Sequence, residues 1–265
     1  MWNWLISSLG LGSTIVLYEG SPFFPNGKVL IDMIDKLGIT VFGTSAKYIS
    51  ALESANISPK KISKLSSLKT ILSTGSPLVE KNFDFVYSNW KLDVQLSSIS
   101  GGTDIISCFA LGNPLLPVFR GELQSKGLGM NVESFDEKGR SVLNETGELV
   151  CTSAFPSMPI YFWNDDNGEL YNSAYFSKYK DVWHHGDLLE INDRGGMKIY
   201  GRSDTTLNPG GVRIGTAEIY RVLDNINYIK DSVVVGYKDS QDEHVILFVK
   251  MNKELNNKII TDIKN

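Results

Sequence analysis

Cysteine is scarce in this sequence, and its scarcity excludes a fold built on disulfides. Only Cys108 and Cys151 occur among the 265 residues, and they lie far apart in the chain. A small secreted scaffold needs several cysteine pairs. We therefore expect two buried thiols in a reducing compartment, and a cytoplasmic protein.

Basic charge is also in short supply. The formal net charge is −4, whereas a general nucleic-acid binder needs a basic surface to meet phosphate. Hydrophobic residues make up 42% and charged residues 21%, as in ordinary globular proteins. The length allows a sizeable core and more than one domain. We expect no nucleic-acid partner.

The apolar N-terminus lacks the features of a signal peptide or a membrane span. The first basic residue is Lys28, which is too late for a signal peptide. We expect a buried helix, then a buried strand at Thr14–Tyr18, and no membrane partner. Because a domain rarely opens with two tryptophans and no polar lead-in, we expect a piece of a longer protein. Small and polar residues interrupt the apolar start at Asn3, Ser7, Ser8, Gly10, Gly12 and Ser13.

Several catalytic and nucleotide-binding motifs are missing. The sequence contains no Gly-x-x-x-x-Gly-Lys-Ser/Thr loop, no Gly-x-Gly-x-x-Gly turn and no Gly-x-Ser-x-Gly elbow. A recognisable P-loop, a Rossmann site and a hydrolase elbow are thereby excluded. The histidines are His184, His185 and His244, and the two cysteines do not supply the further ligands that a zinc site would need.

The first hundred residues alternate between short apolar runs and amphipathic stretches. Such alternation predicts an α/β fold with a parallel sheet and flanking helices. The expected strands are Thr14–Tyr18, Thr40–Phe42, Thr70–Ser73 and Val94–Ser97, and the expected helices are Val29–Leu37, Ala46–Leu52 and Val79–Trp90.

From about Gly127 the pattern changes to that of antiparallel strands. We expect an antiparallel β subdomain and then a truncated small α+β domain, with domains at 1–203 and 204–265. The expected strands are Met130–Phe135, Gly147–Cys151, Leu188–Ile191, Met197–Tyr200, Asp231–Val235 and Val245–Lys250, with a helix at Ala217–Leu223 before a polar helical tail.

Two loops of small residues, Ser73–Pro77 and Ser98–Asp104, follow predicted parallel strands. Ligands bind beyond the carboxyl ends of such strands. Backbone amides and the Thr103 hydroxyl suit phosphate, and the Asp104 carboxylate suits magnesium. An ordinary surface loop is the alternative.

The segment Gly201–Ile214 places two arginines around a Pro-Gly-Gly loop. Arg202 and Arg213 offer rigid forks of donors that match phosphate or ribose oxygens. Upstream, Asp187 opens a strand region and suits both hydroxyls of a ribose. Solvated arginines in a surface turn, and a turn aspartate, are the alternatives.

Taken together and in order, these motifs resemble those of the adenylate-forming superfamily of acyl-CoA synthetases. The resemblance covers nearly the whole chain. It rests on Thr74–Pro77, Ser100–Asp104, Thr146–Leu149, His185–Asp187, Gly201–Asp204 and Gly211–Arg213. The sequence is similar to the acetoacetate-using members at Trp2–Trp4, Thr70–Pro77, Ser98–Phe109, Phe162–Asp165 and Thr206–Pro209.

The resemblance implies an acetoacetate–CoA ligase that uses ATP, CoA and magnesium. ATP and the acid give an acyl-adenylate, which CoA then converts to the thioester. Asp204 would be the catalytic hinge, Thr103 and Arg213 would act on phosphate, and Asp104 would hold magnesium. ATP or AMP would contact Gly75, Ser76, Pro77, Ser98, Ile99, Ser100, Gly102, Thr103, Asp187, Arg202 and Arg213, while Gly210 and Gly211 would flank CoA.

Three positions depart from the usual family pattern. Many relatives carry an acidic residue where Ser76 stands, and a glutamate where Asp104 stands. Short-chain relatives close the acyl pocket with a bulky aromatic at the position of Gly101, so glycine there predicts room for a longer acid such as acetoacetate.

Two family elements are not found in the sequence: the Ser/Thr/Gly-rich phosphate loop and the C-terminal catalytic lysine. We therefore expect a fragment of the ligase. A non-catalytic remnant, or one subunit of a split enzyme that binds AMP or a partner chain carrying the missing portions, is the open alternative.

Overall fold

The computed structural model describes residues 2–205, 207, 214–223, 226–238, 243–254 and 256–264. The chain forms two compact units. The first comprises Met1–His185 and Leu189–Ile199, and the second comprises Gly186–Leu188 and Tyr200–Asn265.

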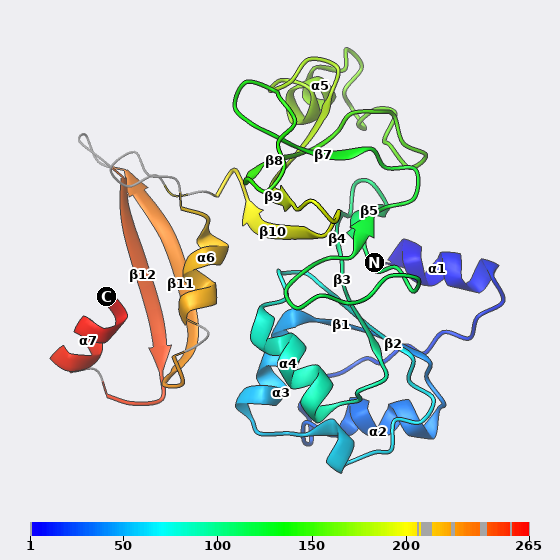
Figure 1. The fold of residues 1–265 in the computed structure, drawn as a ribbon, viewed down its shortest axis with the longest axis vertical. Coiled ribbons are helices and arrows are strands. Elements are labelled where there is room, and N and C mark those ends of the chain that lie inside the picture. The colour runs from blue at the N-terminus through cyan, green and yellow to red at the C-terminus, as the bar shows by residue number, and fades with distance from the viewer. Residues whose placement is uncertain are drawn as a thin grey trace. The chain divides into compact units, whose positions relative to one another are not determined.

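The first unit contains the predicted parallel sheet, but with three strands rather than the four expected. Its order is β1 (Val41–Ser45), β2 (Thr70–Thr74) and β3 (Gln95–Ser98). Apolar side chains of the sheet and helices, among them Ile34, Leu52, Ile71 and Trp90, are fully or almost fully buried. The helices are α2 (Val29–Lys36), α3 (Ala46–Ser54) and α4 (Glu80–Asn89), with α3 beside α4 (Figure 1), and a short 3-10 turn covers Pro59–Lys61.

The prediction for the N-terminus is wrong in two respects. Helix α1 (Trp2–Gly10) forms, but Ile6 and Leu9 are exposed rather than buried. Thr14–Tyr18 is not a strand, and Leu17 is also exposed. An apolar run becomes a strand only when a neighbouring strand takes its backbone hydrogen bonds, and no described strand pairs with this segment.

None of the described helices has both the length and the apolar character that crossing a bilayer requires.

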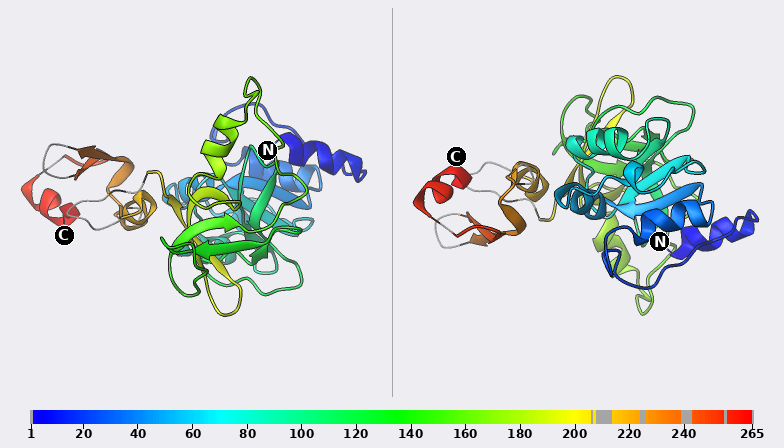
Figure 2. Two further views of the ribbon diagram at one scale, coloured as in Figure 1. Left: turned by 90° about the horizontal axis from the view of Figure 1, so that it is seen from above. Right: turned by 90° about the horizontal axis from the view of Figure 1, so that it is seen from below.

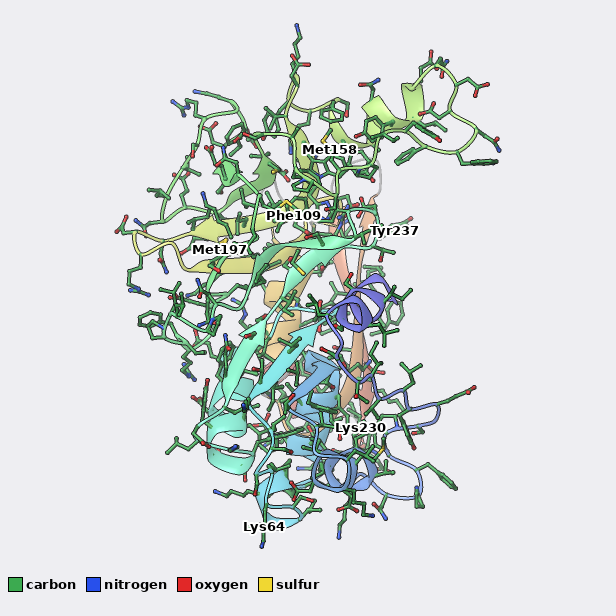
Figure 3. All side chains as sticks on the ribbon, turned by 90° about the vertical axis from the view of Figure 1, so that its right-hand side faces the viewer. Lys64, Phe109, Met158, Met197, Lys230 and Tyr237 are labelled. Atoms are coloured by element: carbon green, nitrogen blue, oxygen red, sulfur yellow. The ribbon has the colours of Figure 1, made fainter. Side chains whose placement is uncertain are left out.

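The second half of the first unit is antiparallel, as predicted. One sheet has the order β4 (Ser100–Gly102), β5 (Ser107–Leu111) and β6 (Ser125–Lys126). Another has the order β10 (Met197–Arg202), β9 (Trp183–Ile191), β8 (Gly147–Cys151) and β7 (Val132–Phe135). Phe109 and Met197 lie in their shared core and Met158 packs against it (Figure 3). Helix α5 (Glu169–Tyr175) precedes β9.

The second unit contains the strand pair and helices that the sequence predicts. Strands β11 (Ile229–Lys238) and β12 (Glu243–Met251) pair antiparallel, with Val234 opposite Leu247. Helix α6 (Thr216–Leu223) lies along β11 (Figure 2), and α7 (Asn257–Lys264) follows β12. Leu207, Leu223 and Val234 are buried between these elements. Lys230 and Tyr237 mark opposite ends of β11 in Figure 3.

Candidate functional site

The two predicted loops of small residues lie side by side at the carboxyl ends of β2 and β3. The parallel register places Ser73 opposite Ser98. The Ile99 N–H donates to the Ser73 carbonyl at 2.8 Å, and the Thr74 hydroxyl donates to the Ile99 carbonyl at 3.2 Å. Gly75 then turns the chain at φ 92°, a conformation that favours glycine. The nucleotide-binding roles of Gly75, Ser76, Pro77, Ser98 and Ile99 stay predictions.

Part of the predicted Ser98–Asp104 loop is a strand. Ser100, Gly101 and Gly102 form β4, which pairs with β5 so that Gly101 faces Cys108 and Gly102 faces Ser107. A turn follows from Thr103. Extended backbone satisfies its polar groups by pairing, and β5 supplies the partner that the loop prediction did not include.

Position 101 requires glycine, because its Cα lies close to the backbone of β5. A Cβ atom built there would lie 2.2 Å from the Ser107 carbonyl oxygen and 2.8 Å from the Cys108 Cα. Both atoms belong to the backbone, so they cannot move aside as a flexible side chain would. Selection of the acyl chain by Gly101 stays a prediction, and the geometry adds a second reason for glycine.

Asp104 lies in a contact network that connects β4 with helix α5. The Tyr175 hydroxyl donates to Asp104 Oδ2 at 2.5 Å. The Cβ that Gly102 lacks would fall 2.1 Å from Asp104 Oδ1 and 2.7 Å from His185 Cε1. The carboxylate and the imidazole therefore pack against the same glycine. Sequence reasoning missed Tyr175, whose partner is 71 residues away; its one sequence signal is the i, i+4 spacing from Tyr171 on one helix face.

Aromatic rings hold this network in place. Tyr175 stacks on Trp183 with centroids 3.6 Å apart and planes 15° apart. Trp183 donates from Nε1 to His185 Nδ1 at 3.5 Å, and the Phe109 ring meets His185 edge-on at 4.7 Å. Buried Asp165 caps α5, because its carboxylate accepts backbone N–H groups of the first helical turn.

Asp187 and Arg202 come together in the second unit. Asp187 is only 8% exposed, and its Oδ1 lies 3.8 Å from Arg202 Nη1. Gly186 adopts φ 80°, and a Cβ there would lie 2.8 Å from Arg202 Nη2. The Ser203 N–H donates to the Gly186 carbonyl at 2.8 Å. A carboxylate held in this way can accept hydrogen bonds from vicinal hydroxyls.

Arg202 also engages Asp204 with two nitrogens. Its Nε and Nη2 donate to Oδ1 and Oδ2 at 3.1 and 2.9 Å. Hydrogen bonding from Arg202 holds the pKa of Asp204 below its ordinary value. The hinge role of Asp204 stays a prediction. Gly210, Gly211 and Arg213 lie outside the described residues.

The described residues do not form a metal centre of their own. They contain no group of three or more His, Cys, Asp or Glu side chains suited to a metal ion. His184 instead contacts buried Glu148, with 2.9 Å between Nε2 and Oε2, and Lys178 pairs with the other carboxylate oxygen. Magnesium is commonly bound by one or two carboxylates together with substrate phosphates, and Asp104 fits that arrangement.

Three known proteins are similar to this chain in sequence or in fold. The acetoacetyl-coenzyme A synthetase of Rhizobium meliloti is 52% identical over the whole chain, which covers 41% of that protein. A solved acetoacetyl-CoA synthetase from Streptomyces lividans matches 99% of the chain with a TM-score of 0.90 and 40% identity, again over 41% of its length. The anthranilate CoA ligase AuaEII, solved in complex with anthranoyl-AMP, has the same fold, with a TM-score of 0.75 at 19% identity over 95% of this chain and 47% of its own.

No family profile matches the chain. The chain spans about two fifths of the length of the relatives it matches. The sequence alignment nonetheless includes all of this chain, and the structural match includes 99% of it. Along its whole length the chain is therefore similar to about two fifths of an acetoacetyl-CoA synthetase.

Proposed function

We propose that this chain supplies the nucleotide and acyl sites of an acetoacetate–CoA ligase. Such an enzyme joins ATP and acetoacetate to form acetoacetyl-AMP and pyrophosphate. The thiol of CoA then attacks the acyl carbon, the thioester forms and AMP leaves. The homology to acetoacetyl-CoA synthetases supports the reaction class and the use of ATP and CoA.

The observation that carries the proposal is the paired Asp187 and Arg202. In the proposed complex the Asp187 carboxylate accepts hydrogen bonds from the two ribose hydroxyls. Arg202 helps to orient that carboxylate, because its guanidinium lies 3.8 Å away. A carboxylate with few water contacts favours ligand hydroxyls that replace the lost hydration.

The β2–β4 region supplies the remaining groups in this proposal. Gly75, Ser76 and Pro77 line the adenine, and the Thr103 hydroxyl donates to the α-phosphate. Asp104 holds magnesium, which neutralises phosphate charge when bound. Arg213 and the Gly210–Gly211 pair are assigned to phosphate and to CoA from the family resemblance alone.

Binding of an adenylate mimic to this chain tests the proposal directly. The probe is a non-hydrolysable acetoacetyl sulfamoyl adenosine, measured by isothermal titration calorimetry. A hydrogen bond to a charged group contributes about 1.5–3 kcal/mol, so Asp187→Asn should weaken binding by about 10- to 150-fold. Asp193→Asn is the matched control, because Asp193 lies in the turn of the same hairpin and pairs with Asn144.

Two results would contradict the proposal. One is an unmodified chain that does not bind the mimic. The other is equal affinity for the unmodified chain and Asp187→Asn. An acetyl version of the mimic tests the choice of acid: the acetoacetyl compound should bind more tightly, and the reverse order would exclude acetoacetate as the preferred acid.

A further inference from the structure

We propose that Tyr175 is a positioning residue that holds the Asp104 carboxylate in the orientation in which it meets the magnesium and phosphate of the nucleotide. The inference rests on the proposed function, because it concerns how Asp104 performs its assigned role. It adds helix α5 to the site, which no motif in the sequence had indicated.

The first step of the argument is the hydrogen bond itself. Asp104 is exposed, so without a partner its carboxylate would rotate freely between rotamers in solvent. The Tyr175 hydroxyl donates to Oδ2 at 2.5 Å, as expected for a donor to a charged oxygen. This bond leaves Oδ1 as the oxygen available to a cation, and Oδ1 is the atom that lies against Gly102.

The second step is that Tyr175 is itself fixed. Its ring stacks on Trp183, which is 2% exposed. It also meets the rings of Phe162 and Tyr171 at 5.7 and 5.5 Å between centroids. A donor held by packed rings does not need to be ordered when the ligand arrives, so the carboxylate is organised in advance.

The third step is the shared packing around Gly102. Asp104 Oδ1 and His185 Cε1 both lie within 3 Å of the position that a Gly102 Cβ would occupy. The imidazole is held in turn by Trp183 and Phe109. The carboxylate is therefore restrained by a hydrogen bond on one oxygen and by packing near the other. Partners of this kind around a metal-binding carboxylate typically change metal affinity by about 10- to 100-fold when removed.

The experiment measures how magnesium affects nucleotide binding to the full chain. The probe is α,β-methylene-ATP, titrated by calorimetry at a series of magnesium concentrations. Tyr175→Phe keeps the ring stack and removes only the donor. It should raise the magnesium concentration for half-maximal enhancement by about 10- to 100-fold.

Tyr171→Phe is the matched control. Tyr171 lies one turn earlier on α5 in the same aromatic group, but its hydroxyl donates to the Pro159 carbonyl. Its loss should leave the magnesium dependence unchanged. Asp104→Asn should abolish the magnesium effect, and adding Tyr175→Phe to Asp104→Asn should change nothing further. Thermal unfolding of each variant confirms that the fold is retained.

The outcomes separate the inference from the proposed function. If the unmodified chain does not bind the analogue, or binds it without a magnesium effect, the magnesium role of Asp104 fails and the inference fails with it. If the unmodified chain responds to magnesium and Tyr175→Phe responds identically, only the inference is overturned. Equal shifts in Tyr175→Phe and Tyr171→Phe would also overturn it, because they would indicate a general effect of helix packing.

Discussion

Replacing Gly101 with alanine should destabilise the first unit, although the substitution adds a single methyl group. The new Cβ would lie 2.2 Å from the Ser107 carbonyl oxygen and 2.8 Å from the Cys108 Cα. Contacts below 3 Å must be relieved, and here only the paired backbone of β4 and β5 can move. Overpacking of this kind costs about 1–3 kcal/mol, and a backbone contact places the cost in the upper half of that range.

An opposing effect lowers the net value. Gly101 is not among the residues with positive φ, so alanine adds no strain of that type and restricts the unfolded chain. This restriction stabilises a protein by about 0.4–1 kcal/mol. Combining the two estimates gives a net loss of about 2 kcal/mol.

Urea unfolding followed by circular dichroism measures this loss. Gly10→Ala is the control, because nothing lies within 4 Å of a Cβ built there, and it should be neutral or slightly stabilising. If Gly101→Ala were as stable as the unmodified chain, the packing argument would be refuted.

The acyl-selector role would then gain support from a Gly101→Trp variant that loses affinity for the acetoacetyl mimic but retains it for the acetyl one. If alanine harms binding of both mimics as much as tryptophan does, the glycine serves the backbone.

Three further predictions follow from charged and buried groups. Glu148→Gln should destabilise the first unit by about 1–3 kcal/mol in chemical unfolding, because it removes the charge of a buried carboxylate that pairs with Lys178 and contacts His184; a change below 1 kcal/mol would show that the pair contributes little. Cys108, whose pKa is raised by burial, should react with iodoacetamide more slowly in the folded chain than in urea at pH 8, and equal rates would contradict this. The pKa of Asp204 is lowered, so its pairing with Arg202 stabilises the second unit above the unfolded-state pKa and is lost as pH falls through the folded value. Carboxyl NMR titration should show this pKa rising towards its ordinary value in Arg202→Gln, and no change would exclude the pairing in solution.

The parts of the fold that could be predicted depend on local patterns. The helical spacing of apolar residues in 29–37 predicts α2, and Ile31 and Ile34 of that stretch are fully buried. The apolar run at Thr70–Ser73 similarly predicts β2 within a residue of its observed end. In such segments the apolar side chains that pack into the core are the same ones whose spacing along the sequence indicates a helix or a strand.

The parts that failed depend on partners distant in sequence. Thr14–Tyr18 has the composition of a strand, yet composition does not supply a neighbouring strand. The acyl-selector role of Gly101 stays a prediction, but the sequence did not show that β5 fills the space beside its Cα. A glycine in a sequence does not reveal which atoms approach it.

In the candidate site, too, one arrangement follows from the sequence pattern and another does not. The adjacency of the Ser73–Pro77 and Ser98–Asp104 segments could be predicted, because parallel strands end at the same edge of a sheet. The contact of Tyr175 with Asp104 could not, because it depends on how α5 packs against a turn that lies 71 residues earlier.

The stack of Tyr175 on Trp183 gives this region an optical signature. Two aromatic rings 3.6 Å apart and nearly parallel interact strongly in their near-ultraviolet transitions, and Trp183 is shielded from water. Near-ultraviolet circular dichroism depends on such fixed side-chain packing. The chain thus contains a spectroscopic reporter built from its own residues, one ring of which donates a hydrogen bond to Asp104. A change at that carboxylate can therefore be followed by light, without attaching a label.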